Sequence, residues 1–173
     1  KMILKKILTK NLSKNNIKLI NHFKNTHWKY NIKKQYEWFD LNAHKNDVHL
    51  MVFIKKKLIG YVHLSTRSFY SDKSLKNKKK YILFRNLLVV KKYRNLNIAT
   101  LIMNSVNTYI KKKKLFSFLL CKIRVFKFYK KFNWIKMNKI NYKLIDHNYS
   151  SLAMTYNIKK SNKKNKYFFS YNI

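Results

Sequence analysis

The sequence predicts a single-domain α/β (α+β) protein in which strands lie on both sides of a central helix. Two nearly continuous apolar runs, 81–90 and 115–121, are typical of buried strands. Between them lies a segment with helical spacing of its apolar residues, ending at about Ile110. The 173 residues are 46% hydrophobic, which is enough for one domain with its own core.

The first part of the chain is expected to hold a strand, two helices and a hairpin of two strands. These elements are predicted at 2–8, 13–25, 32–44, 47–54 and 57–69. Ser13 suits the N-cap of the first helix, because its hydroxyl can accept a hydrogen bond from a free backbone amide. Ile17, Ile20 and Phe23 follow at helical spacing and indicate the buried face.

The second part begins with a polar loop at 70–80 and continues through the two buried strands. A short helix is expected at 123–132, a segment leading into a strand at 133–139, and a last core strand at 151–158. The remaining stretch is rich in lysine and asparagine. The sequence therefore predicts one domain at 1–158 and a basic, low-complexity C-terminal tail at 159–173.

The net charge of +36, from 41 Lys and Arg against five acids, has two explanations. A basic nucleic-acid-binding or ribosome-associated protein would gain affinity for phosphates from such a charge. The alternative is drift in an AT-rich genome, because there is one Gly and no Pro, and lysine greatly outnumbers arginine. The lysines are spread over the whole chain rather than concentrated in one segment. We therefore attribute most of the charge to base composition, and nucleic acid is not the expected partner.

Several function classes are not favoured by the sequence. Cys121 is the single cysteine, and the histidines lack the spacing of metal ligands, so we expect neither a disulfide framework nor a metal. No apolar run approaches the roughly 18 residues of a membrane span. The apolar stretch at the N-terminus is too short for a secretory signal. A cytoplasmic protein without a membrane partner is the resulting expectation.

Three motifs together resemble the Gcn5-related N-acetyltransferase (GNAT) superfamily, and the resemblance covers about residues 3–158. "LLVVKKYRNLNIATLIM" (87–103) is similar to the family's strand, phosphate loop and helix, and "FYKKFNWIKM" (128–137) to a second signature. Gly60 in "KLIGYVHL" matches the family's glycine on its third strand. The resemblance implies a GNAT-like acyl-CoA N-acyltransferase fold. Its central sheet would be mostly antiparallel, flanked by about four helices and split at a V-shaped cleft between strands 81–90 and 115–121.

Asparagine stands in two places where the family has glycine. Asn97 occupies the first glycine position of the loop, and Asn133 occupies the glycine position of the second signature. Asparagine is the non-glycine residue that best tolerates left-handed backbone geometry. We therefore expect both residues to adopt that geometry. The added Cβ of Asn97 leaves less room for a phosphate.

The resemblance also implies acetyl transfer from acetyl-CoA, the expected co-substrate, to an amine. Leu87, Leu88 and Val89 would supply the strand backbone that pairs with the pantetheine arm. Arg94 takes the first place of the loop motif. The loop and helix N-terminus would wrap the pyrophosphate, with Asn95, Leu96, Asn97, Ile98, Ala99 and Thr100. Tyr129 takes the place of the family's tyrosine near the thioester sulfur, and core packing is the other explanation for it.

The general base and the acceptor stay open at this stage. His63, His49, Glu37 and Asp40 are candidates for the base, as is a water relay. The resemblance places acceptor selection at residues 25–45 and 63–80. The acceptor would be a primary amine of a small molecule, such as a nucleotide-linked amino sugar, or of a protein. An inactive GNAT-fold binding module is a further alternative, supported by the loss of both glycines.

Overall fold

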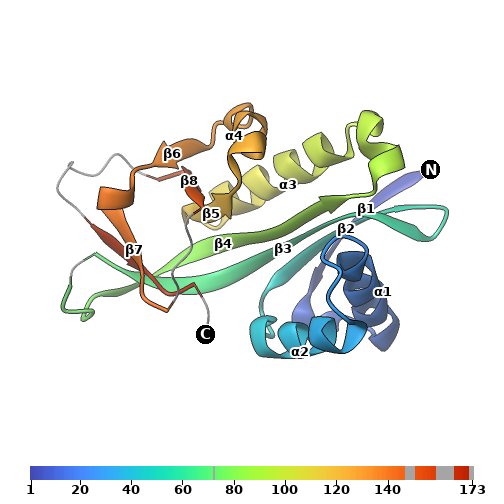
Figure 1. Ribbon diagram of the computed structural model, residues 1–173, viewed down its shortest axis with the longest axis horizontal. Coiled ribbons are helices and arrows are strands. Elements are labelled where there is room, and N and C mark those ends of the chain that lie inside the picture. The colour runs from blue at the N-terminus through green and yellow to red at the C-terminus, as the bar shows by residue number, and fades with distance from the viewer. Residues whose placement is uncertain (72, 147–150, 159–165, 172–173) are drawn as a thin grey trace. The chain divides into compact units, whose positions relative to one another are not determined.

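Two long strands, β3 (Lys57–Tyr70) and β4 (Lys78–Val89), contribute residues to both of the units into which the chain folds. The first unit comprises Lys1–Ser65 and Arg85–Met103, and the second Thr66–Phe84 and Asn104–Ile173. The computed structural model describes residues 1–71, 73–146, 151–158 and 166–171 (Figure 1). The mixed α/β class with a mostly antiparallel sheet is confirmed.

The first unit holds a sheet in the order β1-β2-β3-β4. β1 (Met2–Leu8) pairs antiparallel with β2 (Val48–Ile54), and β2 forms the predicted hairpin with β3. A short 3-10 helix, η1 (Thr9–Asn11), leads from β1 into α1 (Lys14–Asn25), whose N-cap is Ser13 as expected. α2 (Ile32–Asn42) packs beside α1 (Figure 1). It ends two residues before the predicted position, because Ala43 is extended.

The sheet of the first unit is covered on both faces. Strand side chains alternate between the faces, so Met51 and Tyr61 point to α1 and α2, where they join a core cluster with Ile20, Phe23 and Phe39. The opposite face carries the first turns of α3 (Ile98–Lys112), because a Cβ on Gly60 would meet Ile98 and Ile102 there. β4 connects to α3 through the 3-10 helix η2 (Lys91–Leu96).

In the second unit the strand order is β4-β5-β8-β6. β5 (Ser117–Cys121) pairs with β8 (Leu152–Tyr156) over all five of its residues. β5 pairs with β4 in parallel at only two positions, Ile82↔Ser117 and Leu83↔Phe118. Both strands lie wholly within the described residues, so the expectation that they are not hydrogen-bonded along their length is confirmed.

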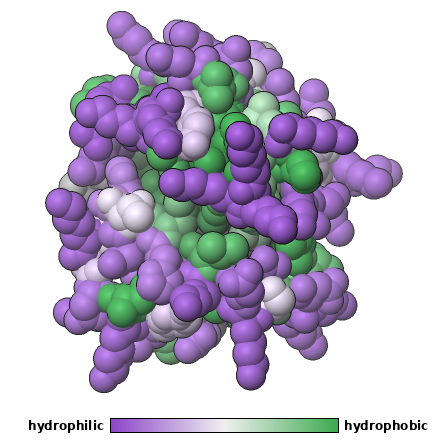
Figure 2. Space-filling model, turned by 90° about the vertical axis from the view of Figure 1, so that its right-hand side faces the viewer, coloured by the Kyte–Doolittle hydropathy of each residue, from purple (hydrophilic) through white to green (hydrophobic). Residues whose placement is uncertain are grey.

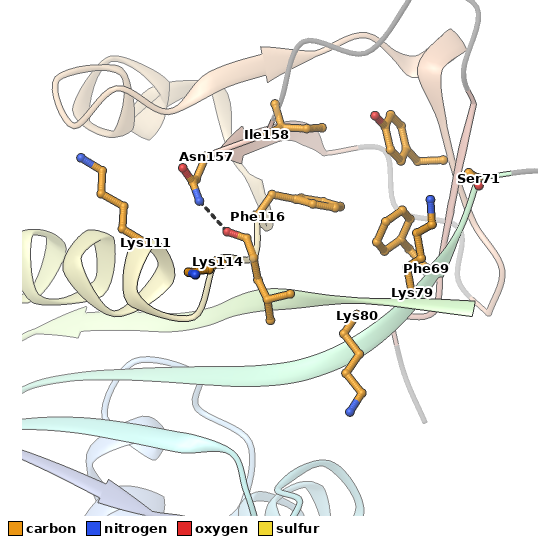
Figure 3. A pocket seen from close by; sticks show the side chains of 11 residues that line it. Phe69, Ser71, Lys79, Lys80, Lys111, Lys114, Phe116, Asn157 and Ile158 are labelled. Atoms are coloured by element: carbon orange, nitrogen blue, oxygen red, sulfur yellow. Dashed lines mark hydrogen bonds between the residues drawn. The ribbon is translucent and has the colours of Figure 1, made fainter. Parts of the chain in front are cut away.

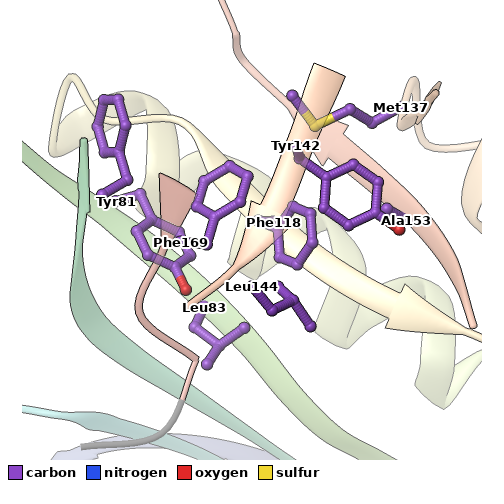
Figure 4. Close-up of a cluster of buried hydrophobic side chains, with 9 residues drawn as sticks. Tyr81, Leu83, Phe118, Met137, Tyr142, Leu144, Ala153 and Phe169 are labelled. Carbon is purple, nitrogen blue, oxygen red and sulfur yellow. The ribbon is translucent and has the colours of Figure 1, made fainter. Parts of the chain in front are cut away.

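The rest of the second unit is built from short elements. α4 (Ile123–Lys130) precedes β6 (Ile135–Met137), and η3 (Lys139–Asn141) precedes β7 (Tyr142–Leu144). β9 (Tyr167–Phe169) pairs with β3 and β7. Figure 4 shows the core of this unit, in which Phe118 stacks on Phe169 with ring centroids 4.3 Å apart.

Three sequence predictions at the level of elements were wrong. β4 begins at Lys78, inside the expected loop 70–80. The strand at 151–158 is not the last, because β9 follows it. The helix predicted at 123–132 was expected to turn its apolar residues inward, namely Ile123, Phe126, Phe128 and Phe132. Ile123 is instead 74% exposed. Of the predicted tail, residues 159–165 and 172–173 lie outside the described residues.

Candidate functional site

The turn between η2 and α3 has the left-handed geometry expected of it. Asn97 has φ 54° and ψ 23°, and α3 begins at the next residue. The first amides of an α-helix have no partner within the helix and carry partial positive charge, so they suit an anion. Asn133, the second asparagine in a glycine position, also has positive φ, at 63°. Both conformational predictions are confirmed.

Gly60 supports this turn from the neighbouring strand. A Cβ added to Gly60 would lie 2.7 Å from Ile98 Cγ2 and 3.0 Å from Ile102 Cδ1. Only glycine therefore allows the first turn of α3 to pack this closely against β3. The amide of Val90 also donates to the carbonyl oxygen of Ile59 at 2.9 Å, which fixes the end of β4 at the same place. The position of the turn is thus set by close backbone approach.

The ten residues expected to bind the cofactor all belong to the first unit. Leu87 to Val89 form the end of β4, directly after Asn86, which has φ 60° and interrupts the regular strand. The side chain of Leu88 is buried in the core, so only its backbone is available to a ligand. Arg94 is exposed, and its Nε donates to the carbonyl oxygen of Val89 at 3.5 Å. This contact links the end of β4 to η2.

Tyr129 belongs to the second unit, where it is the buried residue of α4. Its ring meets Phe84 edge-on at 5.7 Å and lies 6.2 Å from the Trp134 ring. Phe126 and Phe132, expected on the same face, are only half-buried. Burial, and secondly the Cys121 thiol, raise the pKa of Tyr129 above its usual value, so the hydroxyl keeps its proton at neutral pH.

The "FYKKFNW" signature has a structural explanation of its own. The left-handed turn at Asn133 ends α4, and Trp134 then donates its backbone amide to the carbonyl oxygen of Tyr129 at 3.3 Å. The indole of Trp134 is fully buried, and its Nε1 donates to Asn107 Oδ1 at 3.1 Å. The signature therefore fixes α4 against α3 within the second unit.

Two of the candidate bases, His49 and His63, are stacked in the interior of the first unit with ring centroids 4.7 Å apart. Both ring nitrogens of His49 are engaged, one with Thr9 Oγ1 at 2.9 Å and the other with the Tyr61 hydroxyl at 2.8 Å. Burial, and then His63, lower the pKa of His49 to about 2. His49 is therefore poorly suited to take a proton from a substrate.

His63 is held by a carboxylate that the sequence did not single out. Its Nε2 lies 3.1 Å from Asp47 Oδ2 and 3.2 Å from Ser65 Oγ. Asp47 is buried and also accepts a hydrogen bond from the backbone amide of His44. Glu37 and Asp40, the remaining candidates, are exposed on α2. Among the four candidate bases, His63 alone combines burial with a carboxylate partner.

Lys24 was also missed by the sequence analysis. It lies on α1, four residues after Ile20 on the buried face, and is 3% exposed. Its Nζ lies 3.6 Å from the centroid of the Trp38 ring. The signal that could have found it is this spacing, since Ile17, Ile20 and position 24 share one helical stripe.

A pocket of about 830 Å³ lies in the second unit. Figure 3 shows its aromatic side chains, Phe69 and Phe116 among them, with lysines around them. Asn157 donates to the carbonyl oxygen of Leu115 at its edge. None of the residues expected to bind the cofactor, and not Tyr129, lines this pocket. Within the described residues there is no cluster of possible metal ligands and no helix able to span a membrane.

A family model described as the acetyltransferase (GNAT) family matches residues 16–134, which is more than half of the chain. No curated protein is detectably similar in sequence. Among solved structures, Escherichia coli ElaA is 11% identical, with a TM-score of 0.65 over 90% of this chain and 99% of that chain.

Two further solved structures share the fold. Arabidopsis thaliana NAA60, in complex with acetyl-CoA, is 15% identical with a TM-score of 0.64, over 90% of this chain and 98% of that chain. The Bacillus subtilis N-acetyltransferase YlbP, in complex with coenzyme A, is 13% identical with a TM-score of 0.56, over 90% of this chain and 96% of that chain. The expected GNAT-like fold is thereby confirmed, and the chain belongs to the acetyltransferase (GNAT) family.

Proposed function

We propose that the protein transfers an acetyl group from acetyl-CoA to a primary amine. The observation that carries this proposal is the left-handed Asn97 directly before α3, which keeps a phosphate-loop geometry without the glycine. Backbone amides at a helix N-terminus bind phosphate without needing a particular side chain. The acetyl-CoA in the NAA60 complex and the coenzyme A in the YlbP complex support the same cofactor here.

In this proposal the chain's own residues mainly bind and position the cofactor. The backbone of Leu87, Leu88 and Val89 pairs with the pantetheine arm and holds the acetyl carbonyl. The segment from Arg94 to Thr100 surrounds the pyrophosphate. Holding two reactants in the correct geometry supplies much of the rate enhancement in such a reaction.

Tyr129 is the proposed proton donor to the leaving thiolate. A donor must carry its proton before the reaction, and burial keeps the Tyr129 pKa above its usual value. For the base we favour His63, since Asp47 orients its ring and stabilises the imidazolium that forms. The alternative is a water relay, which leaves the reaction independent of His63.

The acceptor carries a primary amine, and a nucleotide-linked amino sugar is the small-molecule class that the basic surface suits. A nucleic-acid-binding function is supported only by the charge. On the face shown in Figure 2, hydrophilic side chains extend over most of the surface, and apolar ones are exposed between them. This distribution favours base composition over a dedicated nucleic-acid surface.

Calorimetric titration of the purified protein with acetyl-CoA tests the proposal. We expect saturable 1:1 binding, together with release of free thiol when amines are added. Binding without turnover for any amine would favour an inactive GNAT-fold module. Absence of acetyl-CoA binding, with salt-dependent binding of RNA, would instead favour the nucleic-acid function.

A further inference from the structure

The ammonium group of Lys24 is buried in the first unit without a hydrogen-bond acceptor among the described residues. A buried, unpaired charge costs several kcal/mol unless the group loses its proton or finds a partner. The face of the Trp38 ring, with its centroid 3.6 Å from Nζ, stabilises this cation.

A second cation lies at the same indole. Arg85 is 5% exposed, its Cζ lies 5.7 Å from the Trp38 ring centroid, and its Nη1 donates to Asn42 Oδ1 at 2.9 Å. The buried acid described in this unit, Asp47, contacts His63 and the amide of His44. The positive charges of Lys24 and Arg85 therefore lie at the same indole ring, and no described carboxylate forms a hydrogen bond with the lysine.

Base composition does not account for this lysine. Lysine and isoleucine both have AT-rich codons, so drift supplies an apolar residue as readily as a basic one at a buried helix position. An isoleucine or methionine at position 24 would bury apolar surface with Ile20 and Phe23 at no electrostatic cost. An amine on this buried face is therefore unfavourable unless it binds a partner.

We propose that Lys24 and Arg85 bind an acidic group, a carboxylate or phosphate, of the acceptor whose amine is acetylated. This inference rests on the proposed function and narrows its acceptor to amines that also carry an anion. Arg85 lies on β4 two residues before Leu87, so the anion is held beside the strand segment assigned to the acetyl group. Trp38 is half-buried, and its ring centroid lies 3.6 Å from Lys24 Nζ.

The pKa of Lys24 distinguishes it from lysines on the surface. Burial, and secondly the charge of Arg85, lower the pKa of Lys24 to about 7. The other groups that interact with it are the Trp38 ring on α2, Arg85 on β4 and His49 on β2. At pH 8 Arg85 is charged and His49 is neutral. Anion binding favours the charged amine, so the Lys24 pKa rises when the site is filled.

NMR of protein carrying ¹³Cε-labelled lysine tests the binding directly. The Lys24 signal is identified as the one absent from Lys24→Met, and its pKa is measured in chloride, acetate and inorganic phosphate. We expect acetate or phosphate to raise this pKa by at least about one unit. The anion that raises it further shows whether the acidic group of the acceptor is a carboxylate or a phosphate. Anions that bind while the Lys24 pKa stays constant would overturn the proposal.

A second test compares the acetylation kinetics of pairs of amines, of which one carries a carboxylate or phosphate and the other does not. We expect kcat/KM to favour the acidic amines, and Lys24→Met to remove about 10-fold or more of that preference. Lys18→Met, on the exposed face of α1, should keep it. An unchanged preference in Lys24→Met would reject the assignment. A different result would contradict the proposed function itself, namely that the unmodified protein does not bind acetyl-CoA.

Discussion

Gly60 lies directly against Ile98, the first residue of α3, with only 2.7 Å between a Cβ at position 60 and Ile98 Cγ2. Gly60→Ala should therefore force this turn away from β3. We expect a loss of roughly 1–3 kcal/mol in the free energy of unfolding, measured in urea, and weaker acetyl-CoA binding.

The double variant Gly60→Ala/Ile98→Ala removes the clashing atom. Because the two side chains are in contact, its loss of stability should be smaller than the sum of the two single losses. Additive losses would show that the contact does not limit the position of the turn.

Asn97→Gly should raise the affinity for acetyl-CoA. Removing the Cβ eases the left-handed backbone and leaves more room for a phosphate. Asn133→Gly is the matched control, because it relieves the same backbone geometry in the second unit. Calorimetry should show tighter binding for the first variant and no change for the second. Equal or weaker binding in Asn97→Gly would count against the phosphate loop.

Tyr129→Phe should slow acetyl transfer by about 100-fold or more, since it removes only the proton donor. The ring contacts with Phe84 and Trp134 remain, so the melting temperature and acetyl-CoA affinity should hardly change. Tyr156→Phe, which removes the hydroxyl from another buried tyrosine beside Trp134, serves as the control. An unaltered rate would exclude Tyr129 from the mechanism.

Lys24 should make stability depend on pH. Its pKa is lowered from 10.5 to about 7 in the folded protein, so between these values the unfolded chain binds more protons at this position. The free energy of unfolding should therefore rise with pH from about 7 to 10, by up to about 1.4 kcal/mol per unit from this group.

Urea unfolding at pH 7, 8 and 9 measures this effect. Lys24→Met should be more stable than the unmodified protein at pH 7, and its advantage should shrink as the pH rises. Lys18→Met should follow the unmodified protein in parallel. Parallel curves for both variants would show that Lys24 is charged in the folded state over this whole range.

The regular elements and the left-handed geometry of Asn97 and Asn133 could be predicted because their signals are local. Helical spacing located α1, and the sequence around Asn97 already implied a turn before a helix. β9 could not be predicted in this way. Its three residues follow a basic low-complexity stretch, and only pairing with β3 and β7 makes them a strand.

The polar interior of the first unit could be predicted only in part. His49 and His63 lie directly opposite each other in the β2–β3 hairpin. Their partners are Thr9, which comes from η1, and Asp47, the residue directly before β2. Lys24 occupied an apolar stripe, yet a lysine-rich composition hid it. What distinguishes it from the other lysines is burial beside Trp38 and Arg85, which arises only when α1, α2 and β4 are assembled.

The chain's single glycine separates two requirements that glycine usually meets together. Among the described residues, eight non-glycine positions have positive φ, and they are filled by asparagine, lysine or leucine. Gly60 is not one of them. Residues other than glycine can thus adopt left-handed backbone geometry at a tolerable energetic cost. They cannot replace glycine where a Cβ would occupy the space of a neighbouring side chain. The chain's one glycine stands at such a position, where α3 packs directly against the backbone of β3.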